Sequence, residues 1–286
     1  MKLPMNKNWM HEEAIAYGIV NISVVDMRAQ SVFQSEMVNQ TLLGTIVPIL
    51  DKRDEFYLIQ NWDGYWGWVN KHTIIIVDLE KAESWFNGRR VIVTANYGLV
   101  HTTADEDSDI ISDLVAGVVL KKIKTEGTFT QVEMPNGETG YIKSHLVEDE
   151  DQHCRIKISQ QKIVQQARKF LGIPYLWGGN STKGFDCSGF VQTVYRLLNF
   201  NLPRDSGPMS REGQNIPIEK GYENLKTGDL IFFGKSQRRI NHVAIYLGDQ
   251  LYIHSRGKVM INSLDPKHRL YEDYLKSLLI KVQRFI

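Results

Sequence analysis

Cys187 and two histidines, His242 and His254, are the residues of this chain whose types and order could do chemistry. A cysteine reacts through its thiolate, and an imidazole can accept the thiol proton near neutral pH. Cys187 opens a run with helical spacing, whereas the histidines follow at the edge of a predicted β-hairpin. The combination indicates covalent cysteine catalysis by a thiol and an imidazole from different elements.

The start of the predicted helix makes only a small contribution to the reactivity of Cys187. Free backbone N–H groups and the helix dipole favour the thiolate there by about 1 kcal/mol, somewhat less than one pKa unit. The neighbouring Asp186, a typical N-cap residue, opposes this effect when it is ionised. We therefore expect an imidazole to supply the rest of the activation.

The alternation of apolar residues places the two histidines on one face of the hairpin. Residues 242–247 and 251–254 read as strands in which the odd-numbered positions are apolar. If the odd positions share a buried face, His242 and His254 lie together on the other face. We expect His242 to accept the Cys187 proton as general base, and His254 to hold the tautomer of His242 through a ring-to-ring hydrogen bond.

The segment that carries these three residues reads as an α+β domain with its helices first. Residues 158–171 have the apolar spacing of an amphipathic helix, and a glycine-rich loop at 177–185 follows it. A second helix is expected from Ser188 to Leu198, buried along one face. Residues 229–233 and the two histidine-bearing segments read as consecutive strands.

Residues 17–150 read instead as short antiparallel strands separated by glycines. A comparison of the chain with itself, at an offset of 73 residues, reveals a tandem repeat. The matched pairs are Gly44 and Gly117, Val47 and Leu120, Phe56 and Phe129, and Gly67-Trp68-Val69 and Gly140-Tyr141-Ile142. The same offset maps His72 onto His145, which favours an architectural role for both histidines.

An acidic stretch at residues 148–153 is expected to link the repeat to the α+β domain. Cys154 follows this stretch without a helix start or a glycine turn beside it, and we interpret it as incidental. Because the chain has only two cysteines, it has neither a disulfide framework nor the spacing of a zinc site. No metal and no cofactor are expected.

The charge balance argues against several classes of partner. The 34 Lys plus Arg and 33 Asp plus Glu residues give a net charge of +1, which provides no general field for nucleic acid or an anionic membrane. No stretch approaches the roughly 18 apolar residues of a membrane span, and the N-terminal residues lack the apolar core of a secretory signal. We expect a monomer without nucleic-acid or membrane partners, in the cytoplasm; export with a signal already removed is the alternative.

Five motifs surround the candidate catalytic residues. They are Pro174-Tyr175-Leu176-Trp177-Gly178-Gly179, Phe185-Asp186-Cys187-Ser188-Gly189-Phe190-Val191, Leu202-Pro203-Arg204-Asp205-Ser206, Gly228-Asp229-Leu230-Ile231-Phe232-Phe233 and Asn241-His242-Val243-Ala244-Ile245-Tyr246-Leu247-Gly248. Together they resemble the NlpC-type cysteine peptidases, papain-like enzymes of bacterial cell-wall metabolism. The resemblance covers about residues 158–286 and implies a triad of Cys187, His242 and His254.

Each β repeat resembles a bacterial SH3-type barrel, over residues 17–80 and 86–150, after an N-terminal extension of residues 1–16. The expected fold is an α+β papain-like domain at residues 158–286 preceded by two small all-β SH3-like barrels. This architecture resembles the γ-D-glutamyl-L-diamino-acid endopeptidases of the dipeptidyl-peptidase VI type. The resemblance implies hydrolysis of the γ-D-glutamyl–diamino-acid bond in peptidoglycan stem peptides with a free N-terminal L-alanine, by acyl transfer to Cys187 and then to water.

The same resemblance implies roles for residues around the nucleophile. The Tyr175 hydroxyl would join the Cys187 backbone N–H in stabilising the oxyanion. Asp205 would hold the ammonium of L-alanine, and Ser188 and Ser206 would bond the D-glutamate carboxylate.

The first SH3-like segment is implied to complete the substrate site. Glu36 resembles the family position that offers a second carboxylate to the ammonium, and Tyr65 resembles the position of an aromatic wall. A substrate site that these residues close at the amino end of the peptide would explain a preference for a free amine. Without the ammonium as its partner, a buried carboxylate costs several kcal/mol.

Two other functions stay open at this point. The first is a cell-wall-binding protein with a catalytically silent third domain, against which the intact Cys187, His242 and His254 argue. The second is an acyltransferase that passes the same thioester to an amine. The sequence does not separate diaminopimelate from lysine as the diamino acid, or intact wall from released fragments as the substrate.

Overall fold

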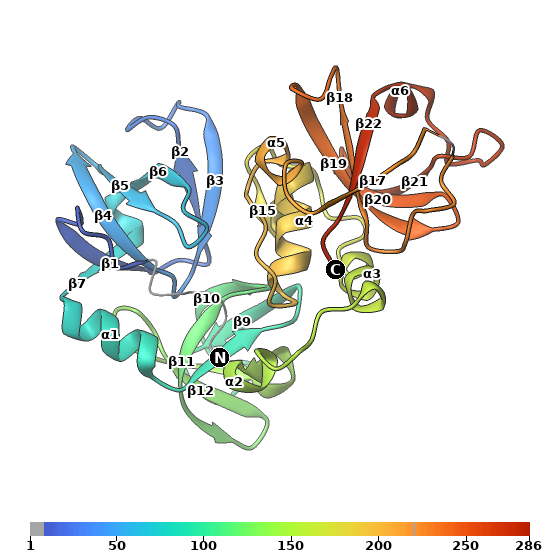
Figure 1. The fold of residues 1–286 in the computed structure, drawn as a ribbon. Coiled ribbons are helices and arrows are strands. Elements are labelled where there is room, and N and C mark those ends of the chain that lie inside the picture. Colours follow the sequence, from blue (N-terminus) through green and yellow to red (C-terminus); the bar gives the residue numbers. More distant parts are fainter. Residues whose placement is uncertain (1–8, 220) are drawn as a thin grey trace. The chain divides into compact units, whose positions relative to one another are not determined.

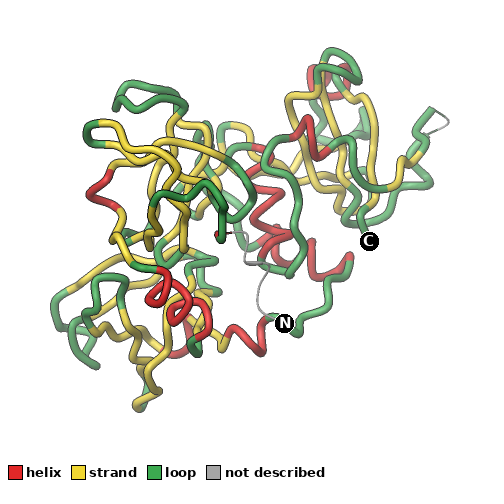
Figure 2. Tube along the Cα trace, turned by 60° about the vertical axis from the view of Figure 1, so that its left-hand side comes forward, coloured by secondary structure: helices red, strands yellow, loops and turns green. Residues whose placement is uncertain are grey.

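The computed structural model describes residues 9–219 and 221–286. The chain forms two compact units, Met1–Ile156 and Lys157–Ile286, whose elements are labelled in Figure 1. Strands are the main element of the N-terminal unit, as the tube in Figure 2 shows. Residues 1–8 of the predicted N-terminal extension lie outside the described residues.

The first half of the N-terminal unit is a seven-stranded antiparallel sheet with strand order β3-β2-β6-β5-β4-β1-β7. Its strands are β1 (Ala16–Val20), β2 (Val24–Arg28), β3 (Met37–Leu42), β4 (Ile46–Arg53), β5 (Phe56–Gln60), β6 (Trp66–Asn70) and β7 (Ile74–Val77), and the short 3-10 helix η2 (Lys71–Thr73) precedes the last. Met27, Val47, Ile59 and Val69 are fully buried in its core. In β2 the buried residues alternate with polar ones, whereas the first four residues of β4 are all apolar or proline and all buried.

The second half repeats this sheet strand for strand. Its elements are β8 (Arg90–Val93), β9 (Tyr97–His101), β10 (Ile110–Val115), β11 (Val119–Glu126), β12 (Phe129–Glu133), β13 (Thr139–Lys143), η3 (Ser144–Leu146) and β14 (Val147–Asp149). The order β10-β9-β13-β12-β11-β8-β14 is the order of the first sheet. Strands β9 to β13 have the bounds of β2 to β6 shifted by 73 residues, so the predicted repeat is confirmed.

The two sheets share one hydrophobic core across helix α1 (Leu79–Asn87). Trp85 of α1 is fully buried, and its indole N–H donates to the Gly44 carbonyl over 2.9 Å. Gly44 and its repeat partner Gly117 both have positive φ, +82° and +89°. A Cβ at Gly44 would lie 2.0 Å from the Val119 carbonyl oxygen, so this turn accepts only glycine without a shift of the second sheet.

The acidic stretch at residues 148–153 is not the linker that its composition predicted. Its first residues belong to β14, which pairs with β8, and the rest form helix α2 (Glu150–His153). Glu150 is only 2% exposed because Arg90 binds its two carboxylate oxygens over 2.7 and 2.8 Å. The linker prediction was wrong because these charges are paired within the fold. Cys154 caps the end of α2 through its backbone N–H, and its side chain is partly exposed.

The C-terminal unit is α+β: three of its helices precede a six-stranded sheet of order β17-β22-β18-β19-β20-β21, and the fourth lies between β21 and β22. The helices are α3 (Gln160–Arg168), α4 (Cys187–Arg196), α5 (Ser206–Met209) and α6 (Asp273–Ser277), and the strands are β15 (Asn180–Ser181), β16 (Gly184–Phe185), β17 (Gln214–Ile216), β18 (Leu230–Gly234), β19 (Ile240–Gly248), β20 (Leu251–Arg256), β21 (Lys258–Ser263) and β22 (Leu279–Arg284). The three predicted strands are β18, β19 and β20. The glycine-rich loop contains the small hairpin β15–β16, which had not been predicted.

Helix α4 is buried on all sides, from Cys187 to Tyr195. The prediction of one buried face was therefore wrong, because the helix packs against β15, β16, β19, β20 and α3. The predicted N-cap is confirmed, since the Asp186 carboxylate accepts the Gly189 N–H over 2.7 Å. A Cβ at Gly189 would lie 2.1 Å from the Gly179 carbonyl oxygen, so glycine lets the helix start sit against the glycine-rich loop.

Both faces of the sheet in the C-terminal unit are covered. The odd-numbered Val243, Ile245 and Ile253 are fully buried, as expected. The even-numbered Ala244 and Tyr246 are also buried, in a second cluster with residues of β22 and α6. This second layer had not been predicted, because its partners come from the last segment of the chain.

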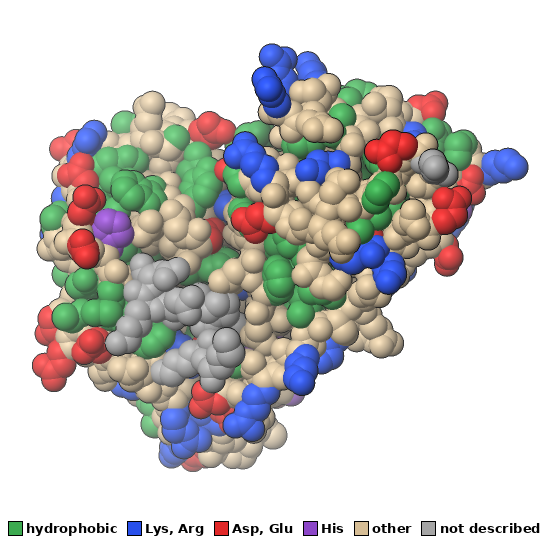
Figure 3. All heavy atoms as spheres, in the orientation of Figure 1, with side chains coloured by type: hydrophobic (Ala, Val, Ile, Leu, Met, Phe, Trp, Pro, Cys, Tyr) green, Lys and Arg blue, Asp and Glu red, His purple; other side chains and the backbone are tan. Residues whose placement is uncertain are grey.

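No described helix is long and apolar enough to cross a membrane. The face drawn in Figure 3 carries both Lys and Arg side chains and Asp and Glu side chains. This distribution agrees with the net charge of +1.

Candidate active site

Cys187 is the first residue of α4, and its side chain lies against the strand that carries His242. The residue is 8% exposed, and its Sγ is 3.9 Å from the carbonyl oxygen of Asn241. A backbone hydrogen bond from Val243 also reaches the sulfur and acts to lower the thiol pKa. The nucleophile candidate thus contacts the main chain on both sides of His242.

The two histidines lie side by side on the β19–β20 hairpin. Ile245 pairs with Ile253 and Tyr246 with Tyr252, so even-numbered residues of both strands share a face. The Nε2 of His242 lies 2.8 Å from the Nδ1 of His254. The proximity predicted from strand alternation is therefore confirmed.

Asn262 extends this chain of hydrogen bonds, and the sequence analysis had missed it. Its Oδ1 lies 2.9 Å from the Nε2 of His254, and its Nδ2 donates to the Leu270 carbonyl over 2.9 Å. Asn262 comes from β21, where it pairs with Tyr252 of β20. Val259 and Ile261 continue the apolar odd positions in β21, so the same two-residue period predicts Asn262 on the face that carries His254.

Burial favours the uncharged forms of all three predicted triad residues. It raises the pKa of the Cys187 thiol to about 12, with a further increase from the neighbouring Asp186 carboxylate. It lowers the pKa of His242 to about 3 and that of His254 to about 4. A neutral thiol beside a neutral imidazole can pass its proton as the sulfur attacks, which is general-base chemistry.

A buried ion pair stands beside the nucleophile. The Nη2 of Arg204 is 2.5 Å from Oδ2 of Asp186, and its Nη1 is 3.0 Å from Oδ1. The same Nη1 donates to the Ser188 hydroxyl over 3.0 Å, and that hydroxyl donates to Asp186 over 3.3 Å. Ser188, predicted to bind the substrate carboxylate, is thus engaged within the protein. The pairing of Arg204 with Asp186 had not been predicted.

The other predicted residues of this unit lie at different depths. Tyr175 is half-buried, and burial, then the charges of Cys187 and Asp186, raise its pKa to about 12. Asp205 is exposed at the N-cap position of α5, and Ser206, the first residue of that helix, is buried.

Glu36 and Tyr65 belong to the N-terminal unit. Glu36 lies in the loop between β2 and β3 and is exposed, whereas Tyr65 lies between β5 and β6 and is partly buried. Their part in a substrate site stays a prediction. Within residues 9–219 and 221–286, no group of three or more His, Cys, Asp or Glu side chains could hold a metal ion.

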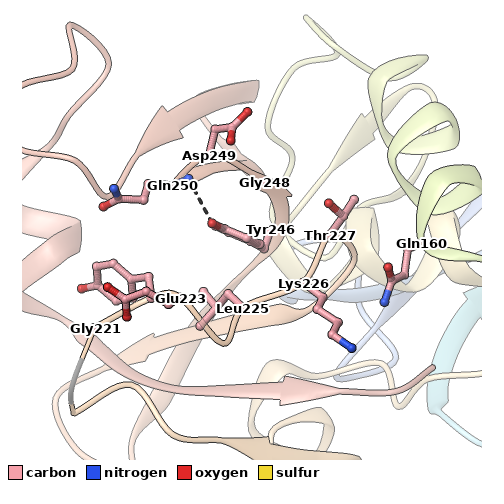
Figure 4. Close-up of a pocket in the computed structure, with 11 residues that line it drawn as sticks. Gln160, Gly221, Glu223, Leu225, Lys226, Thr227, Tyr246, Gly248, Asp249 and Gln250 are labelled. Atoms are coloured by element: carbon pink, nitrogen blue, oxygen red, sulfur yellow. Dashed lines mark hydrogen bonds between the residues drawn. The ribbon is translucent and has the colours of Figure 1, made fainter.

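A separate cavity of 560 Å³ lies at the other end of β19. Tyr246, Asp249 and Gln250 line it from the β19–β20 turn, and Lys226 faces it from the loop before β18, as Figure 4 shows. The Gln250 N–H donates to the Tyr246 hydroxyl over 3.0 Å. This cavity contains none of the predicted site residues.

Known protein families match a segment of each unit of the chain. Residues 172–283 match the NlpC/P60 family, and residues 23–75 match the bacterial SH3 domain. A γ-D-glutamyl-L-lysine dipeptidyl-peptidase of Bacillus cereus is 31% identical over 232 residues, which cover 77% of this chain and 68% of that protein. Dipeptidyl-peptidase 6 of Lysinibacillus sphaericus is 26% identical over 279 residues, 92% of this chain and 97% of that protein.

The fold has a counterpart among solved structures. The crystal structure of an NlpC/P60 family protein from Bacillus cereus superimposes with a TM-score of 0.82 and 23% sequence identity, over 94% of this chain and 99% of that one. Sequence and fold lead to the same assignment: this chain belongs to the NlpC/P60 family of cysteine peptidases.

Proposed function

We propose that this protein is a cysteine endopeptidase that hydrolyses the bond between γ-D-glutamate and the diamino acid of peptidoglycan stem peptides with a free N-terminal L-alanine. The observation that carries the proposal is the 2.8 Å contact of His254 with His242, whose strand β19 contacts the Cys187 thiol. The names of the relatives, γ-D-glutamyl-L-lysine dipeptidyl-peptidase and dipeptidyl-peptidase 6, support the bond and substrate class.

In the proposed reaction, His242 accepts the thiol proton while Sγ of Cys187 forms a bond to the γ-carbonyl carbon of D-glutamate. The Cys187 backbone N–H and the Tyr175 hydroxyl hydrogen-bond the oxyanion that develops. The C–N bond then breaks, and His242 returns its proton to the departing amine of the diamino acid. This leaves a thioester on Cys187 and a neutral imidazole.

The second half of the reaction uses the same groups with water as the nucleophile. His242 takes a proton from water as its oxygen adds to the thioester carbonyl. The carbon–sulfur bond breaks, and the thiolate recovers the proton from His242. The released product is L-alanyl-γ-D-glutamate, and the enzyme returns to its starting state.

Substrate recognition is assigned to polar residues near the helix start. The exposed carboxylate of Asp205 is suited to the substrate ammonium, and the hydroxyls of Ser188 and Ser206 to the D-glutamate carboxylate. Ser188 would have to turn its O–H away from Asp186 to donate to the substrate. Glu36 and Tyr65 are assigned to the closed end that selects a free amine.

The two β-sheets of the N-terminal unit are proposed to be tandem SH3-type barrels. The match of residues 23–75 to the bacterial SH3 domain supports this for the first sheet, and the identical strand order supports it for the second. The C-terminal unit is proposed to be papain-like, because its nucleophile opens a helix that packs on an antiparallel sheet carrying the histidine.

Mass spectrometry of defined stem peptides tests the proposal. L-Ala-γ-D-Glu-L-Lys and its diaminopimelate counterpart, each with a free and an acetylated amine, are incubated with the wild-type chain. We expect release of the diamino acid from the free-amine peptides only. Cleavage of another bond, or equal cleavage of acetylated peptides, contradicts the proposed specificity. An amine-linked product in place of the free acid would indicate acyl transfer.

A further inference from the structure

The hydrogen bonds of Asn262 define which nitrogen of each neighbouring histidine carries a proton. One end of its side-chain amide lies 2.9 Å from the Leu270 carbonyl oxygen. A carbonyl oxygen can only accept, so the end of the amide that faces it must be the NH₂ group. The oxygen of the amide is therefore the end that faces Nε2 of His254, at 2.9 Å.

The amide oxygen can also only accept, so Nε2 of His254 must be the protonated nitrogen of that ring. His254 is fully buried, and burial keeps its imidazole neutral by lowering its pKa. A neutral imidazole has one N–H, so Nδ1 of His254 is left as an acceptor. The 2.8 Å contact between this atom and Nε2 of His242 then requires a proton on Nε2 of His242.

The remaining nitrogen of His242 is the one that matters for a proton transfer. Its ring is neutral for the same reason as that of His254, so a proton on Nε2 leaves Nδ1 without one. In the opposite arrangement, Nδ1 of His242 would carry a proton and could not accept another from a thiol. Whether Nδ1 of His242 carries a proton therefore depends on the orientation of the Asn262 amide, which reaches His242 through His254.

We propose that Asn262 is a positioning residue that, anchored by the Leu270 carbonyl, sets the tautomers of both His254 and His242 and leaves Nδ1 of His242 unprotonated to receive the Cys187 proton. The transfer of the Cys187 proton to Nδ1 of His242 rests on the proposed peptidase function. The tautomers themselves do not, because they follow from hydrogen bonds between described residues.

The surroundings of Asn262 support a fixed direction for its amide. The residue is 6% exposed, so water does not compete freely for its oxygen. A reversed amide would bring its oxygen to the Leu270 carbonyl and its NH₂ to the protonated side of His254, which replaces two hydrogen bonds by two repulsive contacts. The anchor is also independent of the histidines, since the Leu270 carbonyl belongs to the chain beyond β21.

The direct test is nuclear magnetic resonance of the full chain with ¹⁵N-labelled histidine, without substrate. Variants His242→Gln and His254→Gln assign the two rings. We expect proton-bearing Nε2 and bare Nδ1 signals for both His242 and His254. Proton-bearing Nδ1 in either ring overturns the proposal, whatever peptides the protein cleaves.

Substitution of Asn262 provides a second test. Asn262→Leu removes both polar groups at similar volume, and we expect mixed tautomers of His254 and a fall in kcat/KM of at least about tenfold, since a wrong tautomer is strongly inhibitory in related catalytic relays. Asn262→Asp keeps an acceptor for the His254 N–H but loses the donor to the Leu270 carbonyl, so it should keep the His254 tautomer at alkaline pH with an activity between those of Asn262→Leu and the wild type. Unchanged tautomers in Asn262→Leu would contradict the proposal.

Gln283→Leu is the matched control for loss of a buried amide in the same unit. Gln283 is 4% exposed and donates to the Ser210 carbonyl over 3.0 Å, and neither residue belongs to the histidine chain. We expect Gln283→Leu to keep the wild-type tautomers and kcat/KM. Mixed tautomers in both variants would mean that destabilisation of the whole unit is responsible, which overturns the specific role of Asn262. Expected tautomers without peptidase activity would instead refute the proposed function and leave the tautomer assignment standing.

Discussion

Arg204 binds both carboxylate oxygens of Asp186, the residue that precedes the nucleophile, at 2.5 and 3.0 Å. The two side chains are 2% and 13% exposed. The pairing keeps the carboxylate as the N-cap of α4 and places a positive charge close to it. Asp186 raises the pKa of the Cys187 thiol and Arg204 lowers it. The positive charge of Arg204 therefore offsets part of the increase that the Asp186 carboxylate causes.

Arg204→Met should therefore change both stability and thiol reactivity. Removal of one partner of a buried pair leaves an uncompensated charge and costs about 3–5 kcal/mol in the free energy of unfolding. The unpaired Asp186 should also slow the alkylation of Cys187 by iodoacetamide at a given pH, because less thiolate is present. Urea denaturation and alkylation rates measure the two effects.

Arg284→Met is the matched control for this experiment. Arg284 binds the buried Asp229 through two nitrogens, each at 2.7 Å, and Asp229 is 1% exposed. We expect a loss of stability but an unchanged alkylation rate. An equal slowing in both variants would show that the charge of Asp186 does not control the thiol, and faster alkylation in either variant would indicate exposure of Cys187 by unfolding.

Acid should destabilise the protein through its buried histidines. The pKa of His254 is about 4 in the folded chain and roughly 6.5 in an unfolded chain. Between these values the unfolded state binds more protons, so stability is complete above about pH 6.5 and falls as the pH drops towards 4, by up to roughly 1.4 kcal/mol per pH unit. Urea denaturation at a series of pH values should give a shallower decline for His254→Gln than for the wild type. Parallel curves would refute this linkage.

The two cysteines should differ completely in function. Cys187→Ala should abolish peptide cleavage while the fold is kept, because it removes the sulfur that forms the thioester. Cys154→Ala should retain wild-type kcat/KM, since Cys154 belongs to the N-terminal unit and caps α2 through its backbone N–H. Retained turnover in Cys187→Ala, with the circular dichroism spectrum unchanged, would exclude the assigned nucleophile.

Gly44→Ala should destabilise the N-terminal unit more than Gly64→Ala. Both glycines have φ near +80°, which costs a residue with a Cβ about 1–2 kcal/mol. A Cβ at Gly64 meets nothing within 4 Å, whereas one at Gly44 falls 2.0 Å from the Val119 carbonyl oxygen. We expect an additional loss of about 1–3 kcal/mol for Gly44→Ala in thermal or urea unfolding. Equal losses would show that the second sheet moves aside freely.

Glu36→Ala should weaken the use of peptides with a free amine. If its carboxylate holds the substrate ammonium, KM for L-Ala-γ-D-Glu-L-Lys should rise by about tenfold or more while kcat changes little. The acetylated peptide, used as a competitive inhibitor, provides the comparison, because it has no ammonium to lose. The same relative loss of binding for both peptides would argue against this role for Glu36.

Local patterns were sufficient to predict the elements that carry the chemistry. The cap at Asp186 and the helix that Cys187 opens depend on neighbours in the chain, and capping preferences are a property of such neighbours. The meeting of His242 and His254 needed only the two-residue period of a strand and a short turn. The repeat at 73 residues likewise required no structure, because a duplicated sheet repeats its glycines and core positions.

Tertiary structure alone decided how the charged and polar groups are paired. The acidic stretch that resembled a linker became part of the fold because Glu150 meets Arg90, and the cap beside the nucleophile is neutralised because Asp186 meets Arg204. Asn262 could join His254 only once β21 lay beside β20. Burial and ion pairing depend on groups that are distant in sequence and come together only in the folded chain, so no local period encodes them. The sequence by itself thus determined which residues could react, and the tertiary structure decided which protons and charges surround them.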